Sequence, residues 1–236
     1  MSKEQKIRTR VIKGSEVRFI SHLDFMNTIT RALRRADLPI AYSQGYNPRP
    51  ELSFASALAV GLTSDSEYID FVLRKEIAPV EFKNRLNEKF PSGIRIAEAR
   101  EVSLGLDSLM SVINAGRYLV QLEFNRLLKA GEVSEIIDDF MEQEKIEIIR
   151  RRRNKSDREL DLRPMIFSLE LVGVGKKEAT VNMLVQTGSS GNVRPQEVMR
   201  ALANCYEVVK SPKMINIHRV GLYIKEGAKL KDPIEE

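Results

Sequence analysis

Three side chains of this sequence, His22, Asp24 and Asp161, are of types that can serve as catalytic acids, bases or nucleophiles. His22 and Asp24 fall at the start of a predicted helix that Ser21 caps, and residues two apart on a helix do not face one another. A metal-binding pair on a helix needs a spacing of about four residues, so we expect no metal at this pair. Asp24 is predicted to support the cap. His22 either bonds the adjacent loop or contacts a ligand in a cleft beside it.

The string RELDLRP, residues 158–164, places Asp161 between two arginines. A carboxylate among arginines stays ionised, so Asp161 is available as a nucleophile or a general base. The same residues equally suit a strand that is held by salt bridges among Arg158, Asp161 and Arg163.

The loop AYSQGYNPRP, residues 41–50, has the composition of a binding surface. Two prolines fix φ and one glycine frees it. The rings of Tyr42 and Tyr46 can stack on a base or close over a small ligand. The amides of Gln44 and Asn47 can bind the hydrogen-bonding edges of a base, and the Arg49 guanidinium can pair with an anion. On the outward face of the preceding helix, Arg31 and Arg35 (with Arg34) can each bind two phosphate oxygens. The alternatives are a rigid loop that covers the helix end and a solvated helix face.

A second basic region lies in the string RRRRNKSDRELDLR, residues 150–163. Seven basic and three acidic residues give it a charge of +4, against +5 for the whole chain. A concentrated patch attracts a polyanion far better than scattered charge does. The candidate contacts are Arg151, Arg152, Arg153 and Arg163.

The loop TGSSGNVRP, residues 187–195, is rich in glycine and serine and leads into a predicted helix with Pro195 in its first turn. Its backbone N–H groups can hold a phosphate, and the polar side chains of Asn192 and Arg194 can add contacts to it. It is not a P-loop, because no Gly-Lys-Ser or Gly-Lys-Thr follows. The alternative is a flexible turn before the helix.

Strand and helix patterns follow the order β-α-β-β-α-β in the first half of the chain, and the second half repeats this plan with a change, an additional strand. The first half has predicted strands at 7–13, 51–57, 68–73 and 94–97, with helices that begin after Ser21 and at Pro79. The second half has strands at 118–124, 146–152, 165–172, 179–186 and 215–224, with helices at 133–141 and from Pro195. This order predicts an α+β fold with two ferredoxin-like sandwiches in tandem. The expected boundaries are 1–102, a linker at 103–115, 116–225 and a frayed tail at 226–236.

Composition excludes several classes of protein. Hydrophobic residues make up 42% and charged residues 30% of the chain, which is ordinary for a soluble globular protein. No apolar run is long enough for a transmembrane helix, and the N-terminus lacks the apolar segment of a secretory signal. The single cysteine, Cys205, excludes an internal disulfide and a cysteine-ligated iron–sulfur cluster or zinc site within this chain. We expect a cytoplasmic protein with no cofactor, no metal and no membrane partner.

Three strings carry a resemblance to a known family. They are RFISHLDFMNTITRALRRADLPIAYSQGYNPRPELSFASALAVGLTSDSEYIDF, ELDLRPMI and TGSSGNVRP. Together they resemble the bacterial radical-SAM-linked domain family of unknown function, over about residues 6–224. Members of that family occur alone or joined to B12-binding radical SAM proteins. The resemblance implies a bacterial cytoplasmic protein that works with a radical SAM enzyme, and it implies no catalytic residue. The chain has no CxxxCxxC motif, so it resembles the stand-alone member.

These observations lead to three hypotheses. In the first, the chain is an RNA-binding module that presents tRNA or rRNA to a radical SAM modification enzyme. In the second, it is an RNA- or nucleotide-modifying enzyme that uses His22 with Asp24, or Asp161. In the third, it is a protein-binding adaptor for the radical SAM partner.

Overall fold

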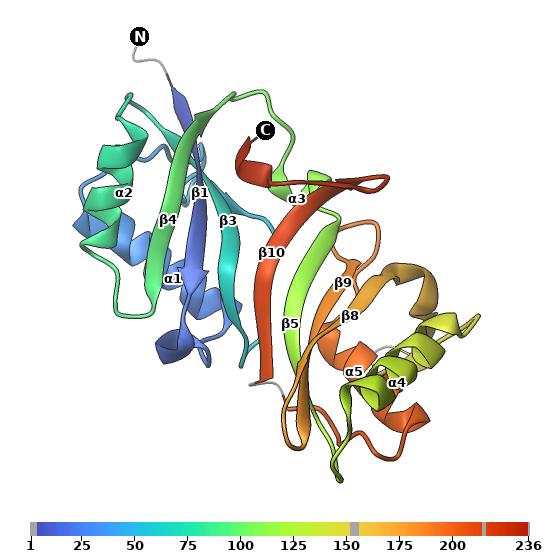
Figure 1. The fold of residues 1–236 in the computed structure, drawn as a ribbon. Coiled ribbons are helices and arrows are strands. Elements are labelled where there is room, and N and C mark those ends of the chain that lie inside the picture. The colour runs from blue at the N-terminus through green and yellow to red at the C-terminus, as the bar shows by residue number, and fades with distance from the viewer. Residues whose placement is uncertain (1–3, 152–155, 214–215, 236) are drawn as a thin grey trace. The chain divides into compact units, whose positions relative to one another are not determined.

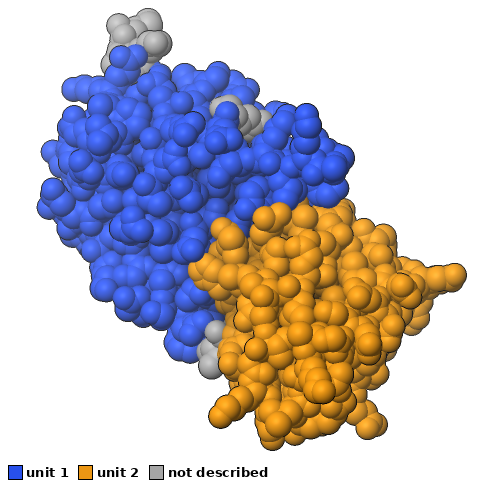
Figure 2. All heavy atoms as spheres, viewed as in Figure 1, with its two compact units in different colours: residues 1–114, 221–236 blue, residues 115–220 orange. Residues whose placement is uncertain are grey.

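The computed structural model describes residues 4–151, 156–213 and 216–235. It is an α+β structure whose chain divides into two compact units, shown in blue and orange in Figure 2. Unit 1 comprises residues 1–114 and 221–236, and unit 2 comprises residues 115–220. Unit 1 therefore includes residues 103–114 of the expected linker and the end of the chain. Among the described residues, no helix combines the length and the apolar character that a membrane crossing needs.

Unit 1 is built on a sheet in which β1 lies between β3 and β4 and is antiparallel to both. β2 pairs with β3, which gives the strand order β4-β1-β3-β2. The elements, in chain order, are β1 (Gln5–Lys13), α1 (His22–Arg35), β2 (Leu52–Phe54), β3 (Thr63–Leu73), α2 (Pro79–Asn87), β4 (Ile94–Val102) and the short helix α3 (Leu109–Val112) (Figure 1). A 3-10 turn at Ser15–Val17 precedes α1.

One face of this sheet packs with α1 and α2 to form the core of unit 1. Side chains alternate along a strand, so β1 places the fully buried Ile7 and Val11 in this core. From α1, Phe25 and Ile29 pack on the same cluster. The helix begins as predicted, because Ser21 Oγ accepts a hydrogen bond from the Asp24 backbone N–H at 3.1 Å. That bond satisfies one of the free N–H groups in the first turn.

A buried ion pair joins β1 to β3. Arg8 donates from Nε to Asp70 Oδ1 at 2.9 Å and from Nη2 to Asp70 Oδ2 at 3.1 Å. Arg8 is 0% exposed and Asp70 is 4% exposed. The third contact of the guanidinium is the backbone oxygen of Pro233, which accepts from Nη1 at 2.8 Å. The pair therefore links the sheet to the end of the chain.

The chain end differs from the frayed tail that the sequence suggested. Strand β11 (Lys229–Lys231) pairs antiparallel with β10 (Ile217–Glu226), and a 3-10 turn at Pro233–Glu235 follows. Ile234 is buried in a cluster with Tyr68, whose hydroxyl donates to Asp232 Oδ1 at 2.6 Å. The segment is too short and polar to show a core pattern by itself, and it is ordered by groups of β1 and β3.

Unit 2 has a sheet in which β9 lies between β5 and β8 and is antiparallel to both. Its elements are β5 (Ala115–Glu123), α4 (Ala130–Glu142), β6 (Glu147–Arg150), β7 (Arg158–Asp161), β8 (Ile166–Val174), β9 (Glu178–Gln186) and α5 (Pro195–Cys205). β6 and β7, which follow α4 and precede β8 in the chain, form a separate antiparallel hairpin. β10 begins in this unit and passes into unit 1 at residue 221.

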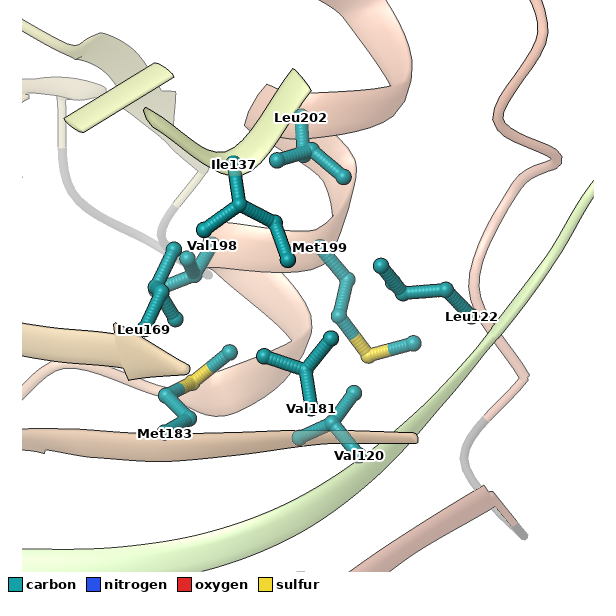
Figure 3. Close-up of a pocket in the computed structure, with 9 residues that line it drawn as sticks. All are labelled: Val120, Leu122, Ile137, Leu169, Val181, Met183, Val198, Met199 and Leu202. Atoms are coloured by element: carbon teal, nitrogen blue, oxygen red, sulfur yellow. The ribbon is translucent and has the colours of Figure 1, made fainter. Parts of the chain in front are cut away.

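The core of unit 2 is apolar and tightly filled. Side chains of the sheet and of α4 and α5 surround a small cavity (Figure 3). Its volume is about 10 Å³. Only carbon and sulfur atoms line it, from Val120, Leu122, Ile137, Leu169, Val181, Met183, Val198, Met199 and Leu202. A void of this size holds one water at most, and an apolar void offers water no partners. We assign it to core packing and not to ligand binding.

Candidate functional site

A cleft of unit 2 lies between the β6–β7 hairpin and α5, and its volume is about 680 Å³. The α5 residues that line it follow a helical spacing, so they share one face of the helix. The hairpin contributes β6 together with Arg151 and Asp157, which lie between β6 and β7 in the chain. The lining consists of Glu147, Ile148, Ile149, Arg150, Arg151, Asp157, Arg194, Glu197, Arg200, Ala201 and Asn204.

A bidentate ion pair fixes the hairpin to α5 at the base of this cleft. Arg150 donates from Nε to Glu197 Oε1 at 2.8 Å and from Nη2 to Glu197 Oε2 at 2.6 Å. Nη2 also donates to the backbone oxygen of Asn192 at 2.9 Å. Glu197 Oε2 in turn accepts from the Arg194 backbone N–H at 3.0 Å, which caps the first turn of α5. The Glu197 carboxylate thus connects the hairpin with α5, and these two elements form the walls of the cleft.

Three further arginines, Arg151, Arg194 and Arg200, are exposed around this pair. Within residues 4–151, 156–213 and 216–235, none of the three forms an ion pair with a carboxylate. Arg194 stands at the N-terminus of α5, where the helix dipole also favours an anion. Since Glu197 already neutralises Arg150, the three exposed guanidiniums outnumber the remaining acids of the lining, Glu147 and Asp157. The cleft is suited to holding phosphate groups.

Asp161 and Arg163 take structural positions next to the hairpin. Asp161 Oδ1 accepts from the backbone N–H groups of Ile146 and Arg163, each at 2.9 Å. These two hydrogen bonds are the main cause that lowers the pKa of the Asp161 carboxyl below its ordinary value. Arg163 donates from Nε to the Met141 backbone oxygen at 2.8 Å, near the end of α4. Both side chains therefore fix the chain path around β6 and β7.

We predict that Asp161→Ala lowers the free energy of unfolding by about 1–2 kcal/mol, because two backbone N–H groups lose their acceptor. Its lowered pKa means that the ionised side chain stabilises the fold above the pKa of an unfolded aspartate, and that this contribution is lost as the pH falls. The difference between wild type and Asp161→Asn should therefore shrink on acidification. Urea unfolding at several pH values measures it. A stable Asp161→Ala protein that has lost a nucleotide-modifying activity would instead support the catalytic interpretation.

His22 and Asp24 each contact a neighbouring side chain of unit 1. The His22 ring meets the Phe54 ring edge-on, with 5.4 Å between centroids. Asp24 Oδ2 accepts from the Ser21 hydroxyl at 2.6 Å within the cap of α1. No group of three or more histidine, cysteine or acidic side chains among the described residues could hold a metal ion. His22 thus packs beside β2, the strand that follows the 41–50 loop.

The remaining candidates of unit 1 lie on its surface. Residues 43–49, which include Gln44, Tyr46, Asn47 and Arg49, are exposed, and Tyr42 is half-buried at the base of the loop. Arg31 and Arg35 are exposed on α1, and Arg35 Nη2 donates to the Lys89 backbone oxygen at 2.7 Å. These positions agree with the outward helix face that the sequence indicated.

The structure brings together only part of the predicted set. Arg151 and Arg194 line the cleft, and Asn192 contacts it through its backbone oxygen. Arg152 and Arg153 lie outside the described residues. Glu197 and Arg200 were not among the predicted site residues, although the spacing Arg194–Glu197–Arg200 on a predicted helix indicates one polar face.

Comparison with known proteins gives a family and a fold. The family model described as "Uncharacterized protein conserved in bacteria (DUF2344)" matches residues 6–195. No curated protein matches the chain. Among solved structures, a chain of a "Cbf5-Nop10-Gar1 Complex" is similar with a TM-score of 0.52 and 8% identity, over 93% of this chain and 50% of that one. A chain of an "H/ACA RNP bound to a substrate RNA containing 2'-deoxyuridine" has a TM-score of 0.46 and 8% identity, over 92% and 45%. The chain thus spans about half the length of these two solved chains, and at 8% identity the likeness to the first concerns the fold alone.

Proposed function

We propose that this chain, which belongs to the DUF2344 family of bacterial proteins, is an RNA-binding module whose cleft in unit 2 holds the phosphate backbone. One observation carries the proposal: three exposed arginines surround an ion pair that is already neutral, and only two further carboxylates line the cleft. Arginine is the residue best suited to phosphate, since its planar fork can bind two oxygens. Buried or paired arginines, such as Arg8 and Arg150, take no part in this binding.

We also propose a fold for each unit and a partner for the chain. We take both units as ferredoxin-like, because their strand orders, β4-β1-β3-β2 and β10-β5-β9-β8, follow the same pattern. In unit 2 the β6–β7 hairpin is then an insertion between the first helix and the second strand, and the cleft exists because of it. From the sequence resemblance, we further propose that the module presents RNA to a radical SAM enzyme in the bacterial cytoplasm.

A protein-binding adaptor is the second candidate, and a specific observation favours it. Phe19 is 68% exposed and Leu23 is 65% exposed at the start of α1. Exposed apolar side chains of this size are typical of partner contacts when they lie together. The enzymatic hypothesis has less support, because Asp24 and Asp161 already accept the hydrogen bonds that hold a helix cap and a hairpin.

A gel shift with bulk tRNA at low salt tests the RNA proposal. We expect a shifted complex that dissociates as the salt concentration rises. Co-purification with a protein partner that survives both high salt and nuclease, together with no tRNA shift at low salt, would instead favour the adaptor.

A further inference from the structure

The base of the 41–50 loop in unit 1 is held in a defined conformation. The Ser43 backbone N–H donates to the Arg49 oxygen at 2.9 Å, and the Arg49 N–H donates to Ser43 Oγ at 3.1 Å. Below these bonds, Tyr42 and Pro50 form a β-bridge, and the Glu51 N–H donates to the Ala41 oxygen at 2.8 Å. Ala41 itself donates to Val72 of β3 at 2.8 Å. The loop is thus a short arm that is fastened to the sheet.

The tip of this arm presents a tyrosine to solvent. Tyr46 is 101% exposed, so its ring gains nothing from packing in the fold. The preceding residue, Gly45, has φ +143° and no atom within 4 Å of the position that a Cβ would occupy. A side chain there would be strained, because L-residues rarely adopt this φ. The glycine permits the turn that projects Tyr46 outward.

The chemistry of the tip favours a nucleotide. Residues 43–49 read Ser-Gln-Gly-Tyr-Asn-Pro-Arg, which includes no acidic side chain and, apart from Pro48, no aliphatic one. A protein hot spot also uses tyrosine and arginine, but it sets them in a packed pocket within a ring of contacts that exclude water, whereas Tyr46 is fully exposed at the tip. An unpaired base instead needs one aromatic face for stacking, amides for its hydrogen-bonding edges and a cation for its phosphate. Tyr46, Gln44, Asn47 and Arg49 supply these groups.

We propose that the 43–49 tip is a stacking site for an unpaired base of single-stranded RNA, with the ring of Tyr46 as the platform. This site rests on the proposed RNA-binding function and adds to it. The cleft of unit 2 holds backbone phosphates whatever the sequence, whereas the tip selects unpaired nucleotides over a duplex, in which bases are already stacked.

The absence of tryptophan from this chain allows a direct test. Tyr46→Trp places a single indole at the tip, where nothing packs against it, and a stacked base quenches indole emission. We expect a fluorescein-labelled 12-nucleotide single-stranded RNA to quench this emission in step with the rise in its own anisotropy. Val80→Trp, at another exposed position of unit 1, is the matched control and should keep its emission.

Tyr46→Ala should bind this RNA about tenfold more weakly, and Tyr46→Phe should bind it as the wild type does.

The two readouts separate this site from the proposed function. If the RNA gains anisotropy while the emission of the Tyr46→Trp protein stays constant and Tyr46→Ala binds normally, RNA binding stands and the stacking site is wrong. If the RNA gains no anisotropy at low salt, both are wrong. Equal quenching by a 12-base-pair RNA duplex would also overturn the selection of unpaired bases.

Discussion

Asp70→Ala is expected to lower the free energy of unfolding by about 3–5 kcal/mol, the loss typical of a buried ion pair deprived of one partner. The Arg8 guanidinium is fully buried and would lose the carboxylate that balances its charge. Urea unfolding followed by circular dichroism gives the change directly.

A double variant separates the uncompensated charge from the loss of packing. Arg8→Met combined with Asp70→Leu removes both charges and keeps apolar volume, and replacing a whole buried pair is often close to neutral. We expect the double variant to be more stable than Asp70→Ala. A double variant that is as unstable as Asp70→Ala would show that the pair matters for its geometry, including the anchor for Pro233, and not for charge compensation.

Replacing Arg151, Arg194 and Arg200 together by glutamine is expected to weaken RNA binding a few hundredfold at about 50 mM salt. Each lost phosphate contact removes about 0.7 from the slope of log K against log salt for a single strand, so the slope should fall by about 2. Arg150 is left in place because it holds the hairpin to α5. Anisotropy titrations of a labelled single-stranded RNA at several salt concentrations measure both quantities.

The matched control is a triple variant of Arg74, Arg95 and Lys229 to glutamine. These residues are exposed in unit 1 and the substitutions change the net charge by the same amount. If affinity depends on overall charge alone, both triple variants will weaken binding equally, and the cleft is then not the binding site. An effect confined to the cleft variant supports it.

Local patterns allowed much of the fold to be predicted, because their causes are local. The Ser21 cap depends on residues three apart, and the alternation of β1 is visible in its own sequence. The buried role of Arg8 was not predictable, since its partners are 62 and 225 residues away. For the same reason, the chain end gave no sign that Ile234 is buried.

The region of the candidate site could be predicted from the sequence, but the role of each side chain in it could not. β6 ends at Arg150 and Arg151 lies beyond the strand, so the two side chains have different surroundings although the sequence presents them as one run of arginines. Arg150 is engaged by Glu197, which is 47 residues away, and Arg151 is exposed. The side chains of Asp161 and Arg163 form hydrogen bonds with nearby backbone groups. The residue types alone do not distinguish this structural role from catalysis or RNA binding.

The salt dependence of wild-type binding to a single-stranded RNA is the most direct test of the proposed function. Three arginine–phosphate contacts in the cleft predict an affinity that falls with salt, with a slope of log K against log salt of about −2 or steeper. Binding with a slope near zero, or no binding at about 50 mM salt, would contradict an arginine cleft that holds the RNA backbone.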